Sequence, residues 1–136
     1  MSRPARDERG QSISLFVLLL MGALILVAGL VIDGGQKVHA AGLAESAAAG
    51  ASRAAGNAAA TKQLGGADPT GAAVLAAKAY LAGQPSVSGA VSVRAGVVTV
   101  RTASTAPTIF LAVIGIDTVT GTGSAEANIV ATGKTR

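Results

Sequence analysis

Residues 13–32 read ISLFVLLLMGALILVAGLVI, a run of 20 residues in which Ser14 is the polar exception. An α-helix rises about 1.5 Å per residue, so such a run spans about 30 Å, the thickness of the hydrocarbon core of a bilayer. A secretory signal has a shorter apolar core of about 7–15 residues. The run therefore predicts a transmembrane helix.

The charges that flank the run differ on its two sides. Three arginines lie within residues 1–12, whereas Asp33 and Lys37 follow the run. We expect a single-pass protein of the cell membrane. Its N-terminus would be cytoplasmic, because Lys and Arg are retained on the cytoplasmic side. Residues 1–12 would then be a cytoplasmic segment, Asp33 a polar stop at the membrane interface, and the C-terminal domain extracytoplasmic.

A small-residue site at Val38-His39-Ala40 leaves a second interpretation open. Signal peptidase cleaves after small residues, so the chain would instead be a small secreted binding protein released near Ala40. This site lies behind Asp33 and Lys37, well beyond the apolar run, which favours the permanent anchor.

Residues 33–64 are rich in Ala and contain no Pro. Ala has the highest helix propensity, so we expect the membrane helix to continue into a long extracytoplasmic helix. Its polar residues recur at helical spacing and leave a stripe of Ala, which suits close packing against a sheet or another helix.

Residues 65–136 are expected to form a small α+β head. Asp68 and Pro69 are typical of a helix start, and apolar spacing extends this short helix to Gly83. β-branched residues then alternate in VSGAVSV and VVTVRT, and Arg94-Ala95-Gly96 between them predicts a hairpin turn.

The remaining segments of the head are less regular. The apolar stretch at 106–116 favours a short helix over a strand, and residues 118–133 predict a final strand or strand pair. The fold class is therefore α+β: an N-terminal transmembrane helix continuing into an Ala-rich helix, then a short helix and a small antiparallel sheet, as in a pilin or pseudopilin.

Composition and charge exclude several function classes. The chain has no Cys, one His at position 39, and a formal net charge of +4 without a block of like charge. These features provide no thiolate, metal or catalytic constellation, and no basic patch with aromatics for nucleic acid. We expect no enzyme, no cofactor, no metal, no small-molecule substrate and no nucleic-acid partner, but a protein that acts by anchoring and packing.

Two glycines in the apolar run, Gly22 and Gly29, are candidate helix-packing residues. They lie seven residues apart and so share roughly one helix face. Small residues on one face let membrane helices approach closely, and the chain would then form a homo- or hetero-oligomer through this face.

The order of these features resembles the TadE/TadG-like proteins of the Flp, or tight adherence, pilus system. The matching pieces are Arg9-Gly10, then VIDGG at 31–35 and AESAAAGA at 44–51. The close match covers about residues 9–51, and TIFLAVIGI followed by GSAEANI is similar to the C-terminal part of small members.

This resemblance implies a minor pilin, pseudopilin or assembly component, whose partners are the membrane, other pilus subunits and an assembly platform. It also implies candidate processing between Gly10 and Gln11, because pilin-type substrates are cut after a glycine. Many of them carry Glu at the fifth position of the mature chain, where this chain has Leu15. Cleavage and retention of the N-terminus both stay open.

Overall fold

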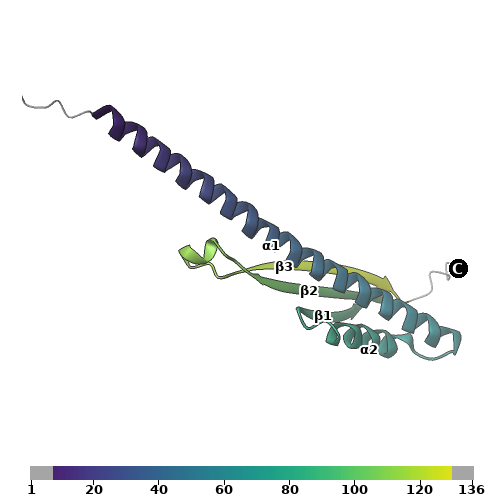
Figure 1. Ribbon diagram of the computed structural model, residues 1–136. Helices are drawn as coiled ribbons and strands as arrows, with labels where there is room; N and C mark the ends of the chain where they lie inside the picture. The colour runs from purple at the N-terminus through teal and green to yellow at the C-terminus, as the bar shows by residue number, and fades with distance from the viewer. Residues whose placement is uncertain (1–7, 130–136) are drawn as a thin grey trace, which may run out of the picture.

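The computed structural model describes residues 8–129, which form a long helix and a small α+β head (Figure 1). The elements in chain order are α1 (Glu8–Leu64), α2 (Pro69–Ala82), β1 (Val87–Arg94), β2 (Val97–Pro107), the 3₁₀ turn η1 (Leu111–Ile114) and β3 (Thr118–Asn128). The predicted α+β class is confirmed, with a long apolar N-terminal helix, a short second helix and an antiparallel sheet.

Helix α1 has 57 residues and no interruption, and its two halves have different surroundings. Its N-terminal half extends beyond the head, whereas its C-terminal half lies along the sheet and α2 (Figure 1). The predicted Ala stripe forms the packed face. Its buried members, each at most 4% exposed, are Ala40, Ala44, Ala47, Ala48, Ala51, Ala55 and Ala59.

The sheet has the order β1-β2-β3 with antiparallel neighbours. Strands β1 and β2 join at the predicted hairpin, where Ala95 (φ 50°) and Gly96 (φ 76°) both have positive φ. A two-residue type I′ turn requires this conformation at both central residues. Residues 118–128 form one strand, which pairs with β2 from Val97↔Asn128 to Pro107↔Thr118.

The apolar stretch at 106–116 forms neither a full helix nor a continuous strand. Strand β2 ends at Pro107, and residues 108–117, here called the β2–β3 loop, contain only the single turn η1. The Thr108 N–H donates to the Asp117 carbonyl over 2.9 Å and closes the loop at its base. Gly115 ends η1 in the left-handed region, with φ 88°.

The core of the head is thin because α1 contributes mainly Ala. Val98 and Val100, both fully buried, face this helix from β2. Strand β3 approaches α1 through Gly121 and Gly123, where a Cβ atom would overlap the helix backbone. The Thr102 hydroxyl donates to the Ala44 carbonyl over 2.6 Å and joins β2 to the same helix turn. Close backbone approach therefore replaces bulky side chains in this interface.

Candidate functional site at the junction of the apolar helix and the head

The N-terminal half of α1 presents a large apolar surface. Its large side chains between Ile13 and Ile32 are exposed, from 43% at Ile32 to 74% at Leu26. Soluble monomers rarely expose contiguous apolar patches of this extent. Within residues 8–129, α1 is the one helix long and apolar enough to cross a membrane. The chain is therefore a candidate single-pass membrane protein.

Asp33 lies just beyond the apolar run and bonds to the head. Its carboxylate accepts the backbone N–H groups of Ile109 (2.8 Å), Phe110 (3.0 Å) and Leu111 (2.6 Å). The side chain is 1% exposed. We call this arrangement the Asp33 latch, because it ties the end of the apolar run to the β2–β3 loop.

The surroundings of Asp33 favour its charged form. Burial by itself raises the pKa of this carboxyl, but the three N–H donors act in the opposite direction and together hold the pKa below its usual value. An ionised carboxylate accepts stronger hydrogen bonds than a neutral one. At neutral pH the Asp33 carboxylate that accepts these bonds is therefore charged, although it does not face solvent.

Gly29, one turn before Asp33, forms the second contact of the junction. Phe110 packs directly on it, and a Cβ atom at position 29 would overlap the Phe110 side chain. By contrast, nothing lies within 4 Å of the Cβ position of Gly22. The structure therefore places Gly29 under a loop of its own chain and leaves the surface at Gly22 open.

The other sequence-predicted sites lie apart from this junction. Gly10 and Gln11 belong to the first turns of α1, and their side chains are outside the described part of the structure. Ala40 is 1% exposed and packs beside Gly121 of β3. The bond that follows Ala40 thus lies inside the helix-to-sheet interface.

Sequence reasoning did not find the partners of Asp33 and Gly29. The Asp33 carboxylate and the Ile109 N–H are 76 residues apart in the chain. The one available signal was the apolar stretch at 106–116, which has more large side chains than such a small head can bury. No local pattern pairs that stretch with a particular turn of α1.

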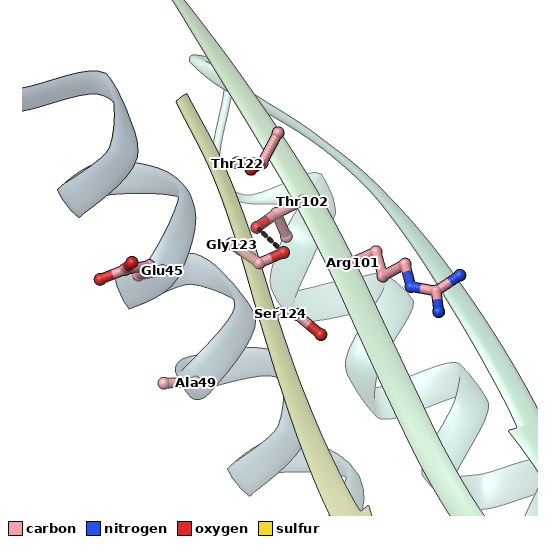
Figure 2. Close-up of a pocket in the computed structure, with 7 residues that line it drawn as sticks. All are labelled: Glu45, Ala49, Arg101, Thr102, Thr122, Gly123 and Ser124. Carbon is pink, nitrogen blue, oxygen red and sulfur yellow. Dashed lines mark hydrogen bonds between the residues drawn. The ribbon is translucent and has the colours of Figure 1, made fainter. Parts of the chain in front are cut away.

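A shallow hollow lies between α1 and the sheet (Figure 2). Its lining consists of Glu45, Ala49, Arg101, Thr102, Thr122, Gly123 and Ser124. Figure 2 shows Glu45 and Arg101 directed away from each other, and the Thr102 hydroxyl is engaged with backbone carbonyls. Across residues 8–129 there is no group of three or more His, Cys, Asp or Glu that could hold a metal ion. The hollow does not bring charged groups together as a catalytic or metal site requires.

Comparison with protein-family models, curated proteins and solved structures finds no match for this chain. The class of this protein comes from its fold and from the junction. It is a candidate single-pass membrane protein in which one helix carries both the apolar segment and the α+β head.

Proposed function

We propose that this chain is a membrane-anchored minor pilin, pseudopilin or assembly component of a Flp/Tad-type pilus or a related secretion machine. It acts by anchoring and by subunit packing. Residues 13–32 span the cell membrane once, residues 1–12 lie in the cytoplasm, and the head lies outside. Its partners are the membrane, other subunits and an assembly platform.

The observation that supports this proposal most is the difference between the two halves of α1. Helix α1 is one uninterrupted helix of 57 residues. The large side chains of its apolar half are exposed, and the Ala side chains of its other half are buried against the head. An exposed apolar helix suits a bilayer, and the same surface suits packing against helices of neighbouring subunits. A subunit that is held in a membrane and then transferred to an assembly needs both properties.

The junction adds a mechanical argument. The Asp33 latch and the Phe110 contact on Gly29 hold the end of the apolar segment against the head at two adjacent turns. The head is therefore coupled to the apolar segment through more than the continuous helix backbone. A force or rotation applied to the apolar segment reaches the head directly.

Packing at Ala40 disfavours the alternative of a secreted protein released there. Cleavage would cut α1 where it lies against Gly121, so the product would lose the first turns of the helix that pack on the sheet. Release at this position would also separate the head from Asp33, which holds the β2–β3 loop.

Intact-mass spectrometry of the membrane fraction tests the anchor. We expect a membrane-resident protein that retains residues 13–32, whether or not it is cut after Gly10. A soluble product that begins after Ala40 would refute the anchor and support the secreted alternative.

Cysteine crosslinking tests association through the open face of the apolar helix. The chain has no Cys, so Gly22→Cys introduces a single reactive site, and Leu24→Cys on the opposite face is the matched control. We expect disulfide-linked dimers or mixed products with Gly22→Cys in excess over Leu24→Cys. Equal or absent crosslinking would refute packing through this face.

Deletion of the gene in its native cell tests the role in the pilus. We expect fewer surface fibres by electron microscopy, with recovery on complementation. Fibres in normal number and length would refute a role in pilus assembly even if the protein is membrane-anchored.

A further inference from the structure

The β2–β3 loop ends in a group of exposed apolar side chains. Their exposed fractions are 58% for Ile109, 85% for Val113, 72% for Ile114 and 45% for Ile116. The loop lies at the end of the sheet that faces the apolar half of α1 (Figure 1). This apolar tip is the part of the head that lies nearest to the candidate membrane span.

The contact between the loop and α1 fixes its level along the helix. Phe110 packs on Gly29, which lies inside the apolar run and four residues before Asp33. Four residues correspond to about 6 Å along the helix axis. With residues 13–32 in the bilayer, Phe110 therefore lies beside the last turn of the span. It is deeper in the membrane than Asp33.

Most of the backbone N–H groups of the loop donate to acceptors within the protein. The Asp33 latch takes three consecutive N–H groups. Four further N–H groups donate to backbone carbonyls: Thr108 to Asp117, Val113 to Phe110, Gly115 to Ala112, and Ile116 to Leu111. The Thr108 hydroxyl donates to the Ile116 carbonyl. In hydrocarbon, backbone polar groups must be satisfied internally because water is absent.

The charges around the loop agree with a lipid environment. Residues 102–116 contain no Asp, Glu, Lys or Arg, and the charged residue of the loop, the exposed Asp117, stands at its base next to β3. The nearest acid on the helix, Asp33, is enclosed by the loop and does not face outward. A loop segment with exposed apolar side chains, a largely hydrogen-bonded backbone and no charge from Thr108 to Ile116 is suited to the boundary between headgroups and acyl chains.

We infer that the β2–β3 loop inserts its apolar tip into the outer leaflet of the bilayer as a second membrane contact beside the span. The occupant of this surface is lipid. The inference rests on the proposed membrane anchor and adds an orientation to it, because two contacts fix the tilt of the head relative to the membrane.

Fluorescence quenching of the full chain in phosphatidylcholine and phosphatidylglycerol vesicles tests the inference. An environment-sensitive dye is attached to Val113→Cys, to Leu26→Cys in the span, and to Leu75→Cys on α2, where the native Leu is 70% exposed. The quenchers are nitroxide-labelled lipid and aqueous iodide. We expect the dye at 113 to be quenched by the lipid nitroxide as strongly as the dye at 26, and several-fold more than the dye at 75.

The outcomes separate the loop from the anchor. Iodide quenching at 113 with lipid quenching at 26 overturns the loop proposal and keeps the anchor. Protection of 113 from both quenchers also overturns it, because a second copy of the chain would then cover the tip. Absence of lipid quenching at 26 overturns the anchor itself, and the loop proposal with it.

A charge introduced at the tip provides a second test. In the Val113→Cys background, Ile114→Asp is expected to reduce lipid quenching several-fold, and Leu75→Asp to leave it unchanged. Both positions are similarly exposed, at 72% and 70%, so neither change should unfold the head, and circular dichroism checks this. Undiminished lipid quenching in Ile114→Asp would overturn the proposal.

Discussion

Replacing Gly121 by Ala would place a Cβ atom where the backbone of α1 already lies, against Ala40 and Ala41. Main-chain atoms cannot rotate away as a long side chain can. Gly121 also pairs with Ser104 in the middle of the β2–β3 ladder, so β3 cannot shift without losing its register. Since φ at Gly121 is outside the left-handed region, the penalty comes from space and not from backbone strain.

The size of the effect follows from two opposing contributions. Overpacking of a well-packed interface typically costs 1–3 kcal/mol, and overlap with a helix backbone places this case near ~3 kcal/mol. Removal of a Gly from a strand returns roughly 0.5–1 kcal/mol. The net loss is about 2 kcal/mol, which in a domain of this size lowers the unfolding midpoint by about 8–16 °C.

Thermal unfolding of the full chain in detergent, followed by circular dichroism, measures this shift. The matched control is Gly42→Ala in α1, where nothing lies within 4 Å of the added Cβ and the exchange should raise stability by ~0.5–1 kcal/mol. An unchanged or higher midpoint for Gly121→Ala, or an equal fall in both variants, would refute the close-approach interface.

Three further predictions concern the latch and the core. Asp33→Asn should speed hydrogen exchange at the 109–111 amides, whereas Asp117→Asn, on an exposed side chain, should not; equal exchange in both variants would count against the latch. Because the pKa of Asp33 is lowered, its stabilising effect is fully present above the ordinary Asp value of about 3.9 and is lost as pH falls through the lower folded value. Unfolding midpoints measured from pH 7 to pH 2 should therefore fall more steeply at the acid end for the native chain than for Asp33→Asn, and parallel curves would contradict this. Val100→Ala, at a fully buried position, should lower the free energy of unfolding, measured with urea, by about 2 kcal/mol, because two methyl groups are lost and a cavity remains. The control Val38→Ala, at a position 74% exposed, should change this free energy by less than about 0.5 kcal/mol.

Local signals were sufficient for much of the architecture. The apolar run and the Ala-rich segment predicted one long helix, because helix propensity and apolar length act over neighbouring residues. Asp68 does cap α2, accepting the Thr70 N–H over 3.1 Å, and Ala95-Gly96 does form the hairpin turn. Each of these features depends on residues within a few positions of one another, which is why they can be read from the chain alone.

The tertiary structure decided how these elements meet. Gly29 was predicted to pack against another membrane helix, and only the folded chain shows that Phe110 of its own head covers it. Asp33 had the sequence character of a simple polar stop, yet it accepts three N–H groups from residues more than 70 positions away. Gly121 and Gly123 gave no signal in the sequence of a close approach to α1.

The physical reason for this division is the range of the interactions. Propensity, capping and turn geometry are local, so the sequence by itself determined the helices, the hairpin and the candidate span. The register of a helix on a sheet depends on which small residues face one another across the interface, and on where a loop can satisfy its N–H groups. Only the folded arrangement sets these pairings, and they are the ones that attach the head to the apolar helix.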